Sequence, residues 1–332
     1  MPNALDLVNP HLRGLVGYAA VDPTEVLARE AGVPPEEVVR LNGNENPYGP
    51  SPRVLEALAR FRDYHLYPDP QQRRVRHALA EYAGVGPERI VCGNGSDELI
   101  DLVLRLCLAP GESVLEPTPT FGMYSFCAAV SGGRVISVPR DELFEIDVEA
   151  MARALRPDTK AIFITSPNNP TGNAASLEQV RRLLELGPLV VVDETYHEFC
   201  GHTVLPLAGA HPNLVVLRTL SKWAGLAGLR IGYGVVHPDL QRILMTMKPP
   251  YNISVAAEVA LLASLEDRAT LLGRVRELVQ ERDRMVRLLG ELPGVRPWPS
   301  QANFVLVQVP QGTGRQVYQG LARRGVFVRY FS

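Results

Sequence analysis

The chain has 332 residues, of which 46% are hydrophobic and 21% charged, and its 34 basic side chains nearly balance its 36 acidic ones. This composition excludes disorder, a collagen-like chain and a nucleic-acid-binding protein that relies on bulk positive charge. No stretch of this sequence approaches the roughly 18 apolar residues of a membrane helix, and its start lacks the basic-then-apolar order of a secretory signal. We therefore expect a cytoplasmic protein with no membrane or nucleic-acid partner, large enough for two domains.

The four cysteines are far apart in the sequence and predict neither a disulfide framework nor a metal site. They form no C-x-x-C pair, and no histidine lies near them at a zinc-ligand spacing. We expect Cys92, Cys107, Cys127 and Cys200 to be buried free thiols, and we expect no metal.

Short β-branched runs alternate with helix-like segments between about residue 90 and residue 236. This alternation is typical of an α/β fold with a mostly parallel sheet covered by helices. Several runs are apolar throughout, as in strands buried on both faces, and in such sheets ligands bind at the carboxyl ends of the strands. The seven predicted strands are Ile90–Cys92, Ser113–Leu115, Arg134–Val138, Ala161–Thr165, Leu189–Val192, Leu214–Leu217 and Ile231–Val236.

The rest of the chain predicts a smaller α/β domain and an N-terminal arm. A helical period from Val255 to about Leu292 predicts two helices or one kinked helix. Strand-like runs at 303–309 and 325–330 flank a helical segment near 316–324. We predict an arm at 1–45 that packs on the small domain or the active site, a large domain at 46–250 and a small domain at 251–332.

A glycine-rich turn follows the first predicted strand and leads into an apolar helix. In Gly93–Glu98, backbone N–H groups at the start of the helix could bind a phosphate group. Ser96 or Asp97 could instead serve only as the helix N-cap. The turn by itself does not decide between these two interpretations.

Two further strand ends carry polar residues. Two prolines and a glycine in Ser166–Gly172 fix a turn that orients the side chain of Asn169, although a plain turn has the same composition. The strand Leu189–Val192 is followed directly by Asp193. A buried carboxylate is unfavourable unless a cation or hydrogen-bond donors accompany it, so Asp193 needs a partner.

Only three residues of the chain are lysines, and one of them follows the strand after the one that ends at Asp193. Lys222 lies in Arg218–Arg230 among apolar residues and glycines, which would lower its pKa and let it react with an aldehyde. Taken alone, Lys222 is equally consistent with a surface lysine. Lys160 lies before a predicted strand and Lys248 precedes two prolines, so Lys222 is the best candidate.

One cofactor, pyridoxal 5'-phosphate, uses all of these groups. Lys222 would bind its aldehyde, Asp193 would keep its ring nitrogen protonated, and Asn169 and Tyr196 would bind its phenolate oxygen. Phe121 could stack on the ring or be a core aromatic residue. The residues expected to bind the phosphate group are Gly95, Ser96, Asp97, Thr219, Ser221 and Arg230.

With these residues in place, the sequence resembles the pyridoxal-phosphate-dependent aminotransferases of the aspartate-aminotransferase fold (fold type I), and most of all the histidinol-phosphate aminotransferases. The two stretches most specific to that group are Leu41–Pro52, with Asn-Glu-Asn-Pro-Tyr-Gly-Pro, and Tyr67–Pro70. The remaining matches are Gly95–Glu98, Ser166–Gly172, Val191–Glu194, Leu217–Lys222, Gly225–Arg230, Pro250–Asn252, Ala302–Phe304 and Val326–Arg329.

The resemblance implies a homodimer with active sites at the subunit interface. It implies that Tyr67 reaches the cofactor phosphate of the partner subunit, that Tyr18 and Asn46 lie near the substrate, and that Arg329 binds the substrate phosphate. From its position alone, Arg329 would more readily be interpreted as a surface residue. Trp223 and Thr195 replace smaller residues that are common in the family, and we expect neither replacement to change the chemistry.

The implied reaction is the reversible transfer of the amino group of histidinol phosphate to 2-oxoglutarate in histidine biosynthesis. Lys222 moves the proton, Asp193 and Tyr196 assist, and one site serves both substrates in turn. An aromatic amino acid aminotransferase or a threonine-phosphate decarboxylase would share the cofactor residues. A cofactor-binding sensor is a further alternative, but such proteins usually carry a DNA-binding module for which this chain has no room.

The resemblance also implies a carboxylate-binding arginine about a dozen residues after Arg329, whereas this sequence stops at Ser332. Bidentate arginine–carboxylate contacts orient substrates strongly. We therefore expect either a longer protein, with an incomplete small domain in this sequence, or poor transamination of glutamate.

Overall fold

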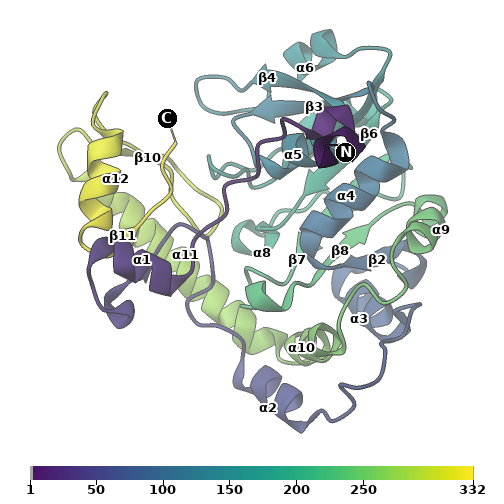
Figure 1. The fold of residues 1–332 in the computed structure, drawn as a ribbon, viewed down its shortest axis with the longest axis horizontal. Helices are drawn as coiled ribbons and strands as arrows, with labels where there is room; N and C mark the ends of the chain where they lie inside the picture. The colour runs from purple at the N-terminus through teal and green to yellow at the C-terminus, as the bar shows by residue number, and fades with distance from the viewer. Residues whose placement is uncertain (1–2, 332) are drawn as a thin grey trace.

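The computed structural model describes residues 3–331, and its centre is one seven-stranded sheet with the order β2-β8-β7-β6-β5-β3-β4 (Figure 1). Neighbouring strands are parallel except at β8, which runs antiparallel to β2 and β7. The strands are β2 (Ile90–Gly93), β3 (Ser113–Thr118), β4 (Arg134–Pro139), β5 (Thr159–Thr165), β6 (Leu189–Asp193), β7 (Leu214–Thr219) and β8 (Gly232–Val235). The mostly parallel sheet and its seven strands are confirmed, with small differences at the strand ends.

Helices cover both faces of this sheet and bury the strands between two apolar clusters. Val190 and Val192 of β6 face one cluster and Val191 faces the other, so both faces of the strand need apolar residues. One face is covered by α4 (Gly95–Cys107), α5 (Met123–Val130) and α9 (Pro238–Met247). The other is covered by α3 (Arg73–Ala83), α6 (Val148–Ala154), α7 (Leu177–Leu184), α8 (His197–Cys200) and α10 (Val255–Glu266).

Several of these helices begin at side-chain caps that the sequence provides. Ser176 and Gln179 form a reciprocal capping box at the start of α7. Asp147 caps α6 and Ser254 caps α10, each by accepting a bond from a backbone N–H of the first turn. These caps explain where the helices begin.

The C-terminal part of the chain contains two consecutive helices and short strands. The expected helical stretch is divided at Asp267 into α10 and α11 (Arg268–Gly290). Short strands β9 (Arg296–Pro297) and β10 (Val307–Gln308) pair with each other, and α12 (Gly314–Ala322) precedes β11 (Val326–Phe327). The prediction of longer strands at 303–309 and 325–330 was wrong, because only two residues of each run belong to a paired strand.

The N-terminal segment crosses from one part of the molecule to the other (Figure 1). Its first residues lie near α5, where His11 Nε2 is 3.2 Å from the carbonyl oxygen of Val130. Further along, α1 (Thr24–Ala31) leads to β1 (Val39–Arg40), which pairs in parallel with β11. The chain then continues into α2 (Pro52–Arg60). Short 3-10 helices lie at Ala4–Leu7, Pro10–Leu12, Pro35–Glu37, Pro87–Arg89, Leu205–Leu207 and Ala227–Leu229.

Within residues 3–331, no helix combines the length and the apolar character needed to cross a membrane.

Candidate active site

Asp193 ends β6 and is the buried acid at the centre of the site. Its side chain is only 2% exposed. Its Oδ1 atom accepts hydrogen bonds from the Thr195 backbone N–H at 3.0 Å and from the Thr195 hydroxyl at 2.6 Å, and its Oδ2 atom accepts one from the Tyr124 hydroxyl at 2.8 Å. Burial raises the pKa of Asp193, and these hydrogen bonds oppose the rise. The partners that the sequence required for Asp193 are therefore donors from the chain itself.

Lys222 lies in the loop after β7, and β7 pairs in parallel with β6, so Lys222 and Asp193 lie at the same end of two neighbouring strands. Its Nζ atom donates a hydrogen bond to the carbonyl oxygen of Gly43 at 3.0 Å. Burial lowers the pKa of Lys222, while the nearby carboxylates, Glu45 first, act in the opposite direction. A lowered pKa increases the share of neutral amine, which is the nucleophilic form.

The other two lysines are engaged elsewhere. Lys160 lies at the amino end of β5 and forms an ion pair with Glu112 at 3.1 Å. Lys248 is buried, and its Nζ atom donates to the carbonyl oxygens of Pro70 at 3.1 Å and Pro250 at 3.2 Å. Lys222 is thus the lysine that the fold brings to the carboxyl edge beside Asp193.

Tyr196, in the turn after β6, is buried and receives a hydrogen bond from a distant part of the chain. Its hydroxyl oxygen accepts from the Asn44 amide at 3.1 Å, and the edge of its ring packs on Phe304 at 5.1 Å between centroids. Burial raises the pKa of Tyr196, so its hydroxyl keeps its proton and is available as a donor.

Asn169 and its neighbour Asn168 behave differently in the turn after β5. The Asn168 amide donates to the carbonyl oxygen of Pro119 at 3.0 Å and to Thr171 Oγ1 at 2.7 Å, and its Oδ1 atom accepts from Thr120 at 3.0 Å. No side-chain hydrogen bond ties Asn169 to other residues of the described chain. The turn therefore uses Asn168 for its own structure and leaves Asn169 free for a ligand.

The glycine-rich turn forms a cradle at the start of α4. The helix begins at Gly95 after Asn94, which makes no side-chain cap bond, so the capping interpretation of Ser96 and Asp97 was wrong. Asp97 instead pairs with Arg230 at 2.8 Å. Gly95 has a φ of 78°, and a Cβ atom there would lie 2.3 Å from Arg230 Nη2. Glycine is favoured here because this φ lies in the left-handed region, and the Arg230 guanidinium occupies the space that a side chain would take.

Two hydroxyl groups from the end of β7 lie in the same region. Thr219 Oγ1 is 2.9 Å from Ser221 Oγ and accepts from the Ser221 backbone N–H at 3.1 Å. Thr219 pairs with Gly232 of β8, and a Cβ atom on Gly232 would lie 2.7 Å from the backbone nitrogen of Ser96. The fold therefore gathers all six residues that were expected to bind the phosphate group.

Three predicted residues from distant parts of the chain meet beside this site. The Arg329 guanidinium donates to the Tyr18 hydroxyl at 3.3 Å and to the Ala19 carbonyl at 3.0 Å. The Tyr18 ring meets Phe121 edge-on at 5.9 Å, and Phe121 in turn meets Tyr124 edge-on at 5.6 Å. Arg329, Tyr18 and Phe121 thus form a row of contacts that Tyr124 connects to the buried acid.

Asn46 and Tyr67 lie differently from this group. The Asn46 amide donates to the backbone carbonyls of Lys222 at 3.0 Å and Trp223 at 3.2 Å, so it holds the lysine loop. Tyr67 is 79% exposed and stacks on Tyr251 at 4.4 Å. Within the described chain, no hydrogen bond links Tyr67 to the other site residues.

Sequence reasoning gave no role to several residues that contact the site. Asn44 binds Tyr196, and its carbonyl oxygen accepts a hydrogen bond from Asn303 at 3.0 Å. Both asparagines stand in motifs that carried the family resemblance, and this was the available signal. Tyr124 and Thr195 bind Asp193. For Tyr124 the sequence offered only a weak indication, namely that a buried tyrosine hydroxyl needs a partner.

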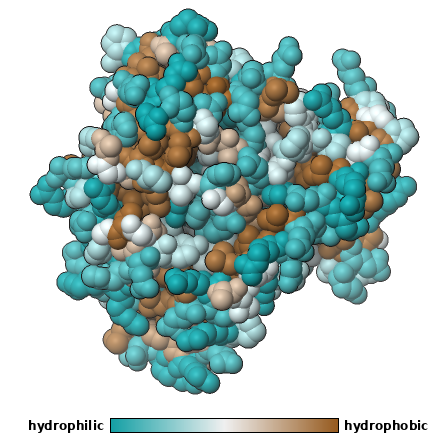
Figure 2. Space-filling model, turned by 180° about the vertical axis from the view of Figure 1, so that it is seen from behind, coloured by the Kyte–Doolittle hydropathy of each residue, from teal (hydrophilic) through white to brown (hydrophobic). Residues whose placement is uncertain are grey.

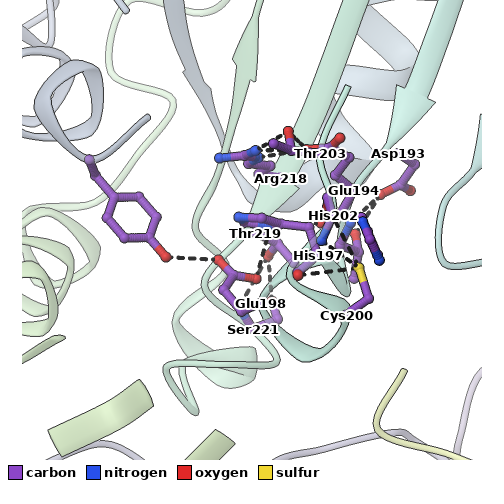
Figure 3. Close-up of polar contacts among 12 residues, drawn as sticks. Asp193, Glu194, His197, Glu198, Cys200, His202, Thr203, Arg218, Thr219 and Ser221 are labelled. Carbon is purple, nitrogen blue, oxygen red and sulfur yellow. Dashed lines mark hydrogen bonds and ion pairs between the residues drawn. The ribbon is translucent and has the colours of Figure 1, made fainter. Parts of the chain in front are cut away.

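A second buried polar cluster lies directly behind the acid (Figure 3). Glu194 Oε2 accepts hydrogen bonds from Arg218 Nη2 at 2.7 Å and Nε at 3.0 Å, and both side chains are almost fully buried. Glu194 follows Asp193 and Arg218 precedes Thr219. The ion pair therefore joins the carboxyl ends of β6 and β7 on the face opposite to Asp193.

Comparisons with known proteins agree with this geometry. The model of the aminotransferase class I and II family matches residues 36–332. A histidinol-phosphate aminotransferase of Roseiflexus castenholzii is 48% identical over 98% of this chain and 90% of the relative. A chloroplastic one of Arabidopsis thaliana is 46% identical over 98% of this chain and 79% of the relative. The crystal structure of histidinol-phosphate aminotransferase from Sinorhizobium meliloti, solved with pyridoxal-5'-phosphate, superposes with a TM-score of 0.88 at 28% identity, covering 97% of this chain and 88% of that chain. The chain therefore belongs to the class I and II aminotransferases and, within them, to the histidinol-phosphate aminotransferases.

Proposed function

We propose that this protein transfers the amino group of histidinol phosphate to 2-oxoglutarate, with pyridoxal 5'-phosphate as cofactor. The products are imidazole-acetol phosphate and glutamate, and the reaction belongs to histidine biosynthesis. The observation that carries the proposal is that Asp193 and Lys222 follow the carboxyl ends of the neighbouring parallel strands β6 and β7, beside the cradle at the start of α4. Relatives at 42–48% identity that are named for this reaction support the choice of substrate.

The residues present fit the cofactor. Gly95 and Gly232 leave room for backbone N–H groups, and Arg230 adds a cation, where a phosphate group needs donors and positive charge. Asp193 Oδ2 accepts only one hydrogen bond from the described chain, so it can accept another from a ring nitrogen. When bound, the cofactor supplies an aldehyde that takes up the amino group and a ring that withdraws electrons from the substrate carbon.

The chain's own residues then divide the work. Lys222 Nζ, whose pKa is lowered by burial, binds the aldehyde and carries the proton. Asp193 would hold a proton at the ring nitrogen, while Asn169 and Tyr196 would donate to the phenolate oxygen. Phe121 would pack against the ring.

Arg329 is proposed to bind the phosphate group of the substrate. A guanidinium presents paired donors to phosphate oxygens, and Arg329 is held beside Tyr18 by a hydrogen bond and by the ring, whose centroid lies 5.7 Å away. Tyr18 would contact the substrate from the same side, and Asn46 would act near it by holding the loop of Lys222.

We further propose a homodimer in which Tyr67 serves the partner's site. The stacked pair Tyr67 and Tyr251 supports this proposal, since both side chains stay exposed, Tyr67 by 79% and Tyr251 by 45%. Figure 2 shows apolar side chains exposed on the face opposite to that of Figure 1, and apolar surface of this kind suits subunit contact. A cytoplasmic location stays a prediction from the sequence, which cell fractionation tests.

The proposed reaction is tested by a panel of amino donors. Purified protein with pyridoxal 5'-phosphate is mixed with histidinol phosphate, phenylalanine or threonine phosphate, each with 2-oxoglutarate, and glutamate formation and cofactor absorbance are followed. We expect glutamate formation with histidinol phosphate only. Preference for phenylalanine would identify an aromatic aminotransferase, and release of carbon dioxide from threonine phosphate would identify a decarboxylase. No turnover of any donor would favour a sensor.

A further inference from the structure

Thr195 places two donors on one oxygen of Asp193. Its backbone N–H lies 3.0 Å and its hydroxyl 2.6 Å from Oδ1, and both residues are buried. A valine would fill the same space but could not supply the hydroxyl bond. A valine at this position would therefore remove the hydroxyl hydrogen bond to Asp193 and keep the backbone one.

Tyr124 binds the other oxygen from the facing helix α5. Its hydroxyl is 2.8 Å from Asp193 Oδ2 and 2.8 Å from Thr165 Oγ1, in a wholly buried position. The Asn168 amide group donates to a backbone carbonyl, and this fixes its orientation. Its Oδ1 atom therefore accepts the hydrogen bond that the Thr120 hydroxyl donates. The Thr165 hydroxyl can then donate to Thr120 or to Tyr124. Because an ionised carboxylate only accepts hydrogen bonds, the Tyr124 hydroxyl donates to Asp193.

All three contacts on Asp193 are donations, so they favour its ionised form against the effect of burial. A carboxylate has about four acceptor positions, and three are occupied. The free position is on Oδ2, where a fourth donor can bind. A proton shared between this carboxylate and a ring nitrogen will reside on the nitrogen only if the carboxylate is the weaker base.

We propose that Thr195 is a positioning residue whose hydroxyl, together with that of Tyr124, weakens Asp193 as a base and so keeps the proton on the ring nitrogen of pyridoxal 5'-phosphate. This inference rests on the proposed function. It differs from the expectation from sequence that the replacement at Thr195 leaves the chemistry unchanged, because the structure shows the hydroxyl bound to the acid itself.

The test compares holoenzymes reconstituted with pyridoxal 5'-phosphate that carries 15N at its ring nitrogen. The variants are Thr195→Val, Thr195→Ser and Tyr124→Phe, and the readout is the 15N chemical shift between pH 6 and pH 9. We expect a pyridinium shift in the wild type, a move toward neutral pyridine in Thr195→Val and Tyr124→Phe, and recovery in Thr195→Ser. Loss of one hydrogen bond to a charged group should also lower kcat with histidinol phosphate about tenfold.

Thr159→Val is the matched control. Thr159 is a buried threonine at the amino end of β5, where its hydroxyl contacts Ser113 at 3.1 Å, so it loses the same group at the opposite edge of the sheet. An unchanged 15N shift in Thr195→Val, with a loss of thermal stability like that of Thr159→Val, would show a merely structural role and overturn the inference. Failure of the wild type to take up the cofactor would overturn the proposed function as well.

Discussion

At the scale of single residues, burial decides which titratable groups are unusual. Asp193 and Lys222 are both buried where two strands end. Burial favours the neutral form of each group, so it raises the pKa of Asp193 and lowers the pKa of Lys222. Perturbed groups of this kind, placed together, are typical of active sites. Burial thus links the local sequence pattern to the chemistry.

Lys222→Ala should abolish covalent attachment of the cofactor and lower turnover by at least about a thousandfold, because it removes both the nucleophile and the proton carrier. Borohydride reduction followed by peptide mapping measures the attachment. Lys160→Ala is the control, since it removes a lysine whose ion pair with Glu112 lies elsewhere. Labelling of Lys160 or Lys248 in the wild-type protein would contradict the assignment.

We predict that the free energy of unfolding depends on pH because of the buried carboxyl group of Glu116. It is 4% exposed in β3, and burial raises its pKa from about 4.5 to about 7. Because the folded state holds the proton more tightly than the unfolded state, this group contributes most stability below pH 4.5 and loses it as the pH rises through 7. The loss should reach about 3 kcal/mol by pH 8.

Urea unfolding of wild type and Glu116→Gln at pH 5 and pH 8 measures this effect. The glutamine variant should be the more stable protein at pH 8, and the difference should largely vanish at pH 5. A constant difference between the two proteins at both pH values would show that Glu116 titrates normally.

At the scale of elements, the site depends on the alignment of two neighbouring strands. Asp193 ends β6, and directly after it Glu194 pairs with Arg218 of β7 (Figure 3). Thr203 adds a further contact, since Arg218 Nη2 lies 2.7 Å from its hydroxyl. This buried pair fixes how the two strand ends lie relative to each other.

Arg218→Met should lower the free energy of unfolding by about 3–5 kcal/mol, because it leaves the buried charge of Glu194 without its partner. Arg53→Met is the matched control: Arg53 pairs with Glu266 at 2.5 Å on the surface, where such pairs contribute about 0–1 kcal/mol. Urea unfolding measures both variants. Equal losses of unfolding free energy in the two variants would show that burial does not strengthen the contribution of the Glu194–Arg218 pair. The double variant Glu194→Leu with Arg218→Met should recover part of the loss.

At the scale of the whole molecule, the proposed dimer predicts complementation between two inactive variants. Tyr67→Phe and Lys222→Ala subunits are mixed under conditions of confirmed exchange. If Tyr67 serves the partner subunit, hybrid dimers contain one unmutated site, and activity should rise well above the sum of the parents. Absence of that rise would place Tyr67 in its own subunit's site or in none. A mixture of Lys160→Ala and Lys222→Ala subunits also forms hybrids with one intact site. The activity of these hybrids is the reference for the experiment.

Much of the fold was predictable because buried parallel strands leave a strong local pattern. The seven runs of β-branched residues gave the sheet, and the strand-end residues Asn169, Asp193 and Lys222 gave the predicted core of the site. The boundaries of the arm and of the two domains stay predictions. The short strands near the C-terminus were overestimated, because an apolar run does not say how many of its residues find a backbone partner.

The sequence by itself determined the class of fold and the cofactor chemistry, because these depend on residue types at fixed places after strands, and it predicted Lys222 as the lysine. Only the tertiary structure decided which distant residues complete the site. Gly43 reaches Lys222, Asn44 reaches Tyr196, and Tyr18 reaches Arg329 across 311 positions of sequence. It also decided the surroundings of Asp193, where Thr195 and Tyr124 donate from two elements. Such contacts depend on how helices and loops pack around the sheet, and local sequence patterns carry no record of that packing.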